Sequence, residues 1–266
     1  SIVKDVKLFH NPINSVKMAK LNGILKIEGT LQDMTFYKTQ DGHLVKTKSG
    51  VSADRIANDP AFARTRENGS EFGASATAGK LLRDAVRNMI TTASDNRVTS
   101  RLTQIMSQIK NLDTTSARGE RSVDVGIATP DGKALLKDFN FNDKAILGAI
   151  LYKPYTITTS TGVINIANLV PALDIAAPSG TTHMSLKGAF AIVDFDLGTS
   201  DVKFTNVENL PLDNTSTSVV LTPSAVPTGT GTKLYFLQVE FFQEVNSVQY
   251  PLNNGAYNAL AIVEVI

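Results

Sequence analysis

The stretch Tyr235-Phe-Leu-Gln-Val-Glu-Phe-Phe242 carries apolar side chains at neighbouring positions. Successive side chains of a β-strand point to opposite faces of the sheet, so this run predicts a strand that is apolar on both faces over part of its length. Such a strand lies at the centre of a β-sandwich, or it offers its second face to another subunit. On the second interpretation, the residues that contribute to self-association include Tyr235, Phe241 and Phe242.

The sequence around this strand is rich in Thr, Val, Ile, Asn and Gly and is cut by turn signals such as Pro178-Ser-Gly180. Short strands at regular spacing with turns between them are typical of β-sandwiches. We therefore expect residues 119–266 to form an antiparallel β-sandwich, jelly-roll or immunoglobulin-like. The expected strands cover residues 122–128, 153–159, 162–168, 183–196, 202–207, 217–222, 233–246 and 256–265, and residues 139–152 fit either a short helix or a strand.

Residues 18–118 show a different pattern, and we expect them to form a β-ribbon followed by a helical module. Period-two alternation predicts strands at 21–28, 33–39 and 43–48, with a hairpin at Asp41-Gly42. Three helices follow: a short one over 61–68 ended by Gly69, one capped by Ser70 whose apolar side runs from Phe72 to Ile90, and one over 98–112. The last two form an αα-hairpin, and 113–119 is a linker. The predicted class is α+β, and residues 1–17 are an extension or an uncertain start.

The chain has 266 residues, of which 42% are hydrophobic and 19% charged, as in an ordinary globular protein. It contains no cysteine, which excludes disulfides, cysteine nucleophiles and thiolate metal sites. Residues 1–125 hold 19 basic and 13 acidic side chains, whereas residues 126–266 hold 7 and 12. This split suggests that the basic half contacts a polyanion or that the halves meet head to tail between copies. A simple preference of helices for Lys and Arg explains it equally well.

Arginines in the helical module form the strongest positively charged feature. Four of them matter for the argument: Arg64, Arg66, Arg83 and Arg87. Two are spaced four residues apart on one helix face, as a phosphate-binding stripe would require. However, acidic residues are interleaved and no aromatic residues are available to stack on bases. We therefore expect a solvated or intermolecular salt-bridged face, with nucleic-acid contact as the alternative.

The sequence shows no recognisable catalytic motif, and no cofactor is expected. The histidines at positions 10, 43 and 183 each stand alone, and Ser107-Gln-Ile-Lys110 matches a Ser-x-x-Lys pattern on an ordinary amphipathic helix. The weak metal candidate is a calcium site formed by Asp194, Asp196 and Asp201. A solvated strand end is the favoured interpretation of these three carboxylates.

No stretch is long and apolar enough to predict a membrane span. Localisation stays open at this point, because it depends on where the protein begins. Translation from Met18 would place it in the cytoplasm or in a released particle, whereas a Ser1 that follows a cleaved signal would mean export.

Two stretches carry a resemblance. The first begins Met18-Ala-Lys-Leu-Asn-Gly-Ile-Leu-Lys-Ile-Glu-Gly-Thr30 and continues through Asn58-Asp-Pro-Ala-Phe-Ala-Arg-Thr-Arg-Glu-Asn68; the second is Val239-Glu-Phe-Phe-Gln-Glu-Val-Asn246. The chain from Met18 to its end resembles an uncharacterised family of Bacteroidota proteins. The resemblance implies that Met18 is the usual start, and it transfers no activity, ligand or site residue.

These observations favour a structural or interaction protein that self-associates into a homo-oligomer, filament, shell or phage-like particle. The β-ribbon at 21–48, with Phe36 and Tyr37, could add to the sheet edge of a neighbouring copy. The alternatives are a nucleic-acid-contacting protein that uses the basic helical module and, third, an enzyme.

Overall fold

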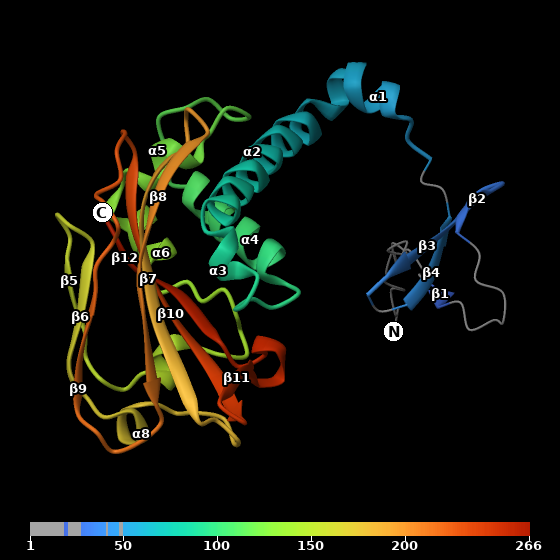
Figure 1. The fold of residues 1–266 in the computed structure, drawn as a ribbon. Coiled ribbons are helices and arrows are strands. Elements are labelled where there is room, and N and C mark those ends of the chain that lie inside the picture. Colours follow the sequence, from blue (N-terminus) through green and yellow to red (C-terminus); the bar gives the residue numbers. More distant parts are fainter. Residues whose placement is uncertain (1–18, 21–27, 41, 48–49) are drawn as a thin grey trace, which may run out of the picture. The chain divides into compact units, whose positions relative to one another are not determined.

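The computed structural model describes residues 19–20, 28–40, 42–47 and 50–266. The chain divides into two compact units, unit 1 (Ser1–Phe62) and unit 2 (Ala63–Ile266). Figure 1 shows the elements of both. The expected domain boundary at residues 118/119 does not coincide with this division, which falls between residues 62 and 63. The reason is that the helices that follow residue 62 share a hydrophobic core with the C-terminal sheet.

Unit 1 contains a four-stranded antiparallel sheet, which we call the N-terminal sheet. Its strands are β1 (Ala19–Lys20), β2 (Gly29–Leu31), β3 (Met34–Thr39) and β4 (Gly42–Thr47), in the order β1-β4-β3-β2. The expected β3–β4 hairpin is present, whereas the strand expected at 21–28 falls almost wholly outside the described residues. The short helices α1 (Ala53–Asn58) and η1 (Pro60–Phe62) complete the unit.

Unit 2 begins with the helices α2 (Ala63–Ala85), α3 (Arg87–Ile90), α4 (Val98–Lys110), α5 (Val123–Ile127) and α6 (Pro130–Leu136). The expected pair of helices separated by Gly69 is wrong, since α2 runs continuously through that residue. The strand expected at 122–128 is also wrong. The Ser122 side chain accepts the Val125 N–H and starts α5, and Gly126 lies so close to α4 that a Cβ there would be 2.0 Å from the Ile109 carbonyl oxygen.

The centre of unit 2 is a five-stranded antiparallel sheet, here the large sheet. It consists of β7 (His183–Asp194), β8 (Thr199–Pro211), β10 (Thr232–Val245), β11 (Val248–Pro251) and β12 (Ala259–Val265). The order is β11-β10-β7-β8, and β12 pairs with β10 on the same side as β11. The aromatic run thus lies on a central strand, as the sequence predicts.

A smaller antiparallel sheet, ordered β5-β6-β9, packs on one face of the large sheet. It is formed by β5 (Thr156–Thr158), β6 (Val163–Leu169) and β9 (Thr217–Leu221). Three short helices lie in the segments that connect elements of unit 2: α7 (Leu147–Ile150) before β5, α8 (Pro171–Asp174) between β6 and β7, and η2 (Leu252–Gly255) between β11 and β12. The helices α2 to α6 lie on the opposite face of the large sheet. The expected α+β class with antiparallel sheets is therefore confirmed.

Alternation along β10 explains the two cores of unit 2. Leu234 and Phe236 belong to the cluster that the helices share with the large sheet. Tyr235, Leu237 and Val239 belong to the cluster between the two sheets. One strand thus supplies side chains to both cores, which is the geometry that its consecutive apolar residues predict.

Two outer strands of the large sheet, β8 and β12, are hydrogen-bonded to other parts of unit 2. Beside β8, the Ser224 N–H donates to the Phe204 carbonyl at 3.0 Å. Beside β12, the Asp138 N–H donates to the Ile262 carbonyl and the Phe141 N–H to the Leu260 carbonyl, both at 2.8 Å. These contacts occupy backbone groups through which a sheet could otherwise pair with another chain.

Candidate functional site

The N-terminal sheet is a surface with apolar side chains on both faces. Phe36 pairs with Val45 across β3 and β4, and the next pair, Tyr37 with Leu44, points to the opposite face. All four side chains are half-buried. Lys46 Nζ lies 5.5 Å from the centroid of the Tyr37 ring, a cation–π distance.

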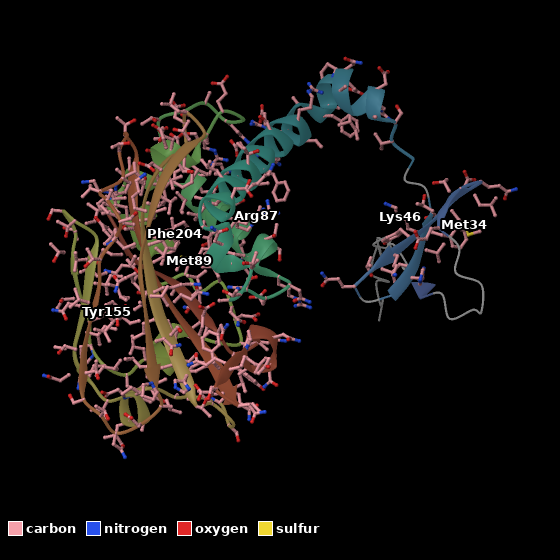
Figure 2. The ribbon with its side chains drawn as sticks, viewed as in Figure 1. Met34, Lys46, Arg87, Met89, Tyr155 and Phe204 are labelled. Carbon is pink, nitrogen blue, oxygen red and sulfur yellow. The ribbon has the colours of Figure 1, made fainter. Side chains whose placement is uncertain are left out.

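The hairpin formed by β2 and β3 adds further exposed apolar surface. Leu31 on β2 and Met34 on β3 are both exposed, and Figure 2 shows Met34 and Lys46 on the two central strands of the sheet. None of the residues 28–62 whose burial can be described, that is, all except 41, 48 and 49, is buried. The N-terminal sheet therefore presents apolar faces without a core of its own among these residues.

The second surface expected from the sequence is corrected by the structure. Tyr235 and Phe241 are 0% and 1% exposed, because the small sheet covers the second face of β10. The Tyr235 ring stacks on Phe190 at 4.5 Å, its hydroxyl donates to the Thr159 carbonyl at 2.5 Å, and burial raises its pKa to about 12. Phe242, at the end of this run, is half-buried.

The four arginines of the helical module do not form one patch. Arg64 and Arg66 lie in the first turn of α2, whereas Arg83 lies near its last residue, and 19 residues of helix separate Arg64 from Arg83 by about 28 Å. Arg64 Nη1 pairs with Glu67 Oε2 at 3.0 Å, and Figure 2 shows Arg87 at the start of α3. The i,i+4 stripe is also interrupted, because α2 ends between Arg83 and Arg87.

The calcium candidate is not assembled. Asp194 Oδ1 accepts the N–H groups of Asp196 (3.1 Å) and Leu197 (2.8 Å), so this carboxylate holds the turn after β7. Asp201 pairs with Lys203 at 2.7 Å. Within the described part of the chain, no three His, Cys, Asp or Glu side chains converge as a metal ion would require.

A buried ionic cluster in unit 2, which the sequence analysis missed, centres on Glu71 of α2. Its carboxylate lies 2.5 Å from Lys110 Nζ of α4 and 2.7 Å from Arg121 Nη2, and it also accepts the Gly119 N–H at 2.8 Å. The Arg121 hydrogen bonds, reinforced by Lys110 and Gly119, hold the Glu71 pKa well below its ordinary value despite burial. The cluster ties α2, α4 and the 113–121 segment together, and it engages the lysine of the Ser-x-x-Lys pattern.

A second polar group, also missed, fastens the helices to the large sheet. Gln238 of β10 is fully buried, and its Nε2 donates to the Met89 carbonyl at 3.2 Å and to Thr92 Oγ1 at 2.8 Å. Glu240, two residues on, pairs with Lys187 of β7 at 3.1 Å. These contacts fasten the end of α3 to the sheet through Gln238 Nε2, whereas Gln238 Oε1 is buried and has no hydrogen-bond partner among the described residues.

No helix in the described ranges combines the length and hydropathy needed to cross a bilayer. Comparison with family models, curated proteins and solved structures found no match for this chain.

Proposed function

We propose that this is a structural or interaction protein that self-associates, and that the N-terminal sheet is the part of each copy that binds a neighbouring copy. The observation that carries the proposal is the absence of any buried residue among the residues of 28–62 whose burial can be described. The apolar faces of a small sheet stabilise a protein only to the extent that they are removed from water. A neighbouring copy covers these faces.

The size of the uncovered apolar surface supports this proposal. Phe36, Tyr37, Leu44 and Val45 are all half-buried within unit 1. Full burial of one large apolar side chain contributes about 1.5–3 kcal/mol. At most about a third of each of these four residues is still exposed, so covering the remaining area stabilises an assembly by at most about 2–4 kcal/mol. The edge strand β2 adds backbone groups that can extend a neighbour's sheet.

Charge gives a reason for a head-to-tail arrangement. Residues 1–62 carry 9 basic and 6 acidic side chains, whereas residues 126–266 carry 7 and 12. A basic unit 1 that binds the acidic sheets of the next copy makes a heterologous contact, and such contacts generate rings, filaments or shells. In this proposal, the two sheets of unit 2 form a β-sandwich of jelly-roll or immunoglobulin-like type that serves as the body of each subunit.

The test is the mass of the protein in solution as a function of concentration, by light scattering and sedimentation. The wild type is expected to grow in mass with concentration, and Phe36→Asp to stay small. Leu173→Asp is the matched control, because Leu173 is an exposed leucine of unit 2. A wild type that stays monomeric at high concentration, or a Phe36→Asp variant that assembles normally, would contradict the proposal.

The nucleic-acid alternative is an outcome of the same experiment. If mass grows only when a polyanion is added, and falls steeply as salt is raised, the basic side chains bind phosphates and the self-association proposal is wrong. Assembly of the nucleic-acid-free protein supports the proposal.

A further inference from the structure

A groove of about 680 Å³ runs between α2 and α4 on the outer side of the helical layer. Its lining is uncharged and consists largely of small side chains: Ala76, Thr99, Ser100, Thr103 and Ser107, with Phe72 at its rim. Small side chains on two neighbouring helices leave room for a bulky side chain from a third helix.

Phe72 is the bulky side chain beside this groove. The stripe of α2 that faces the core consists of Glu71, Ser75, Ala78 and Leu82, and Phe72 lies one position beyond that stripe. It is 63% exposed, contrary to the sequence expectation that places it on the apolar side. Exposure of a Phe beside an uncharged groove leaves both surfaces in contact with water, so each lacks a partner.

The first turns of α2 are covered only in part: Arg118 Nε lies 3.4 Å from Glu67 Oε2, and Arg118 Nη2 donates to Asn68 Oδ1 at 3.3 Å. No residue from Ala63 to Ser70 is buried, and α2 contains Gly69 and Gly73, which disfavour an isolated helix. Helices in proteins are stabilised mainly by packing of one face. The stripe Thr65, Gly69, Phe72 and Ala76 continues the groove surface along this part of α2.

We propose that two copies of the protein join through α2 and α4 in a two-fold contact, in which Phe72 of each copy lies in the groove of the other. This proposal rests on the proposed function, since it names a second surface through which the protein self-associates. The occupant is a second copy because the knob and the groove lie on one surface, and a two-fold contact requires such a self-complementary patch.

The available area agrees with a weak dimer. With 23 and 13 residues, α2 and α4 are about 35 and 20 Å long. At about 10 Å width per helix they offer about 550 Å² per copy, close to the lower limit of about 600 Å² per partner for specific interfaces. We therefore expect a dimer that forms reversibly and depends on concentration.

The experiment compares dimer dissociation constants by sedimentation velocity for the wild type, Phe72→Ser, Ser100→Arg and Leu173→Ser. Phe72→Ser is expected to raise the dimer Kd about a hundredfold, because each dimer loses two buried Phe side chains. Ser100 is an exposed residue of the groove, so Ser100→Arg fills the groove with a large side chain and should raise the dimer Kd to a similar extent. Leu173→Ser, at a more exposed position, should leave the Kd unchanged, and circular dichroism checks that all variants stay folded.

A folded Phe72→Ser or Ser100→Arg variant with the wild-type Kd would overturn this inference. Phe36→Asp separates the two proposals. If it stops growth beyond the dimer while the dimer persists, both hold; if it abolishes all association and the groove variants assemble normally, only the α2–α4 contact is wrong. If the wild type never leaves the monomeric state, both are wrong.

Discussion

Unit 1 and unit 2 both contain antiparallel strands with apolar side chains on two faces, but they cover those faces differently. In unit 2, Phe236 of β10 is buried beneath the helices and Tyr235 beneath the small sheet. In unit 1, Phe36 and Tyr37 occupy the equivalent alternating positions on β3 and are only half-buried. A strand that is apolar on both faces needs a layer on each side, and unit 2 supplies both layers from its own chain. Unit 1 shows no such layers among its described residues, which is why we assign its cover to another copy.

Matched phenylalanine substitutions sharpen this comparison most strongly. Phe236→Ala is expected to lower the free energy of unfolding by about 3–5 kcal/mol, because it leaves a cavity in a closed core. Phe36→Ala should cost less than this in the dissociated protein, because up to about a third of Phe36 is already exposed to water and its loss leaves no closed cavity. Urea unfolding at low protein concentration measures both. Equal losses would show that Phe36 lies in a core of its own.

The ionic cluster of unit 2 gives the next largest effect. Glu71→Gln removes the charge that faces Lys110 and Arg121, and leaves two cations with reduced compensation in a buried setting. Loss of one member of such a cluster costs about 3 kcal/mol, measured by the same unfolding experiment. The exposed pair in unit 1, Arg55 with Asp59 at 3.1 Å, is the control, and Arg55→Gln should cost less than about 1 kcal/mol. Similar losses would remove the distinction between the two units.

Acid should destabilise unit 2 through Glu71 and through Asp113, whose carboxylate accepts the N–H groups of Ser116 and Ser122. Hydrogen bonds hold the pKa of Glu71 and of Asp113 well below their ordinary values of 4.5 and 3.8. The unfolded chain therefore binds more protons than the folded chain, and the free energy of unfolding decreases as the pH falls through and below about 4.5. It should stay level for these groups between pH 7 and 5. Urea unfolding at a series of pH values checks this, and Glu71→Gln should flatten the acid slope.

Calcium should have the smallest effect. The Asp194 carboxylate accepts hydrogen bonds from backbone N–H groups of its own turn, so added Ca²⁺ or chelator is expected to leave the melting temperature unchanged. Asp194→Ala should lower the melting temperature slightly, by loss of those hydrogen bonds. A melting temperature that rises with Ca²⁺ in the wild type and not in Asp194→Ala would revive the calcium site.

Strong periodic signals made much of unit 2 predictable from the sequence. The two-faced run at 235–242 placed β10 at the centre of a sheet, and the apolar repeat at 98–109 placed α4. The failures have local causes. Residues 122–128 are rich in β-branched valine and isoleucine, yet the Ser122 cap and the fit of Gly126 against α4 select a helix. The sequence Pro130-Asp-Gly132 is of a type common in turns, yet it starts α6, which is capped by Thr129 and has Pro130 in its first turn.

The candidate sites were harder to predict, because they depend on which layer covers which face. A strand with two apolar faces does not reveal whether its own chain or a partner covers the second one, and Tyr235 and Phe241 were assigned to the partner wrongly. Because Phe72 is hydrophobic, the sequence predicts that it lies on the side of α2 that meets the core. In the structure its neighbour Glu71 lies on that side and Phe72 is exposed. Glu71 is buried only because Lys110 and Arg121, 39 and 50 residues away, meet it in space.

If another copy covers the N-terminal sheet, the hydrogen exchange of that sheet depends on protein concentration. The exchange of peptides spanning β3 and β4 should be measured across a wide range of protein concentration, with β7 and β10 of unit 2 as internal reference. We expect protection of β3 and β4 to increase with protein concentration, while the reference strands stay equally protected throughout. Strong protection of β3 and β4 that does not change with concentration, in a protein shown to be monomeric, would contradict this expectation.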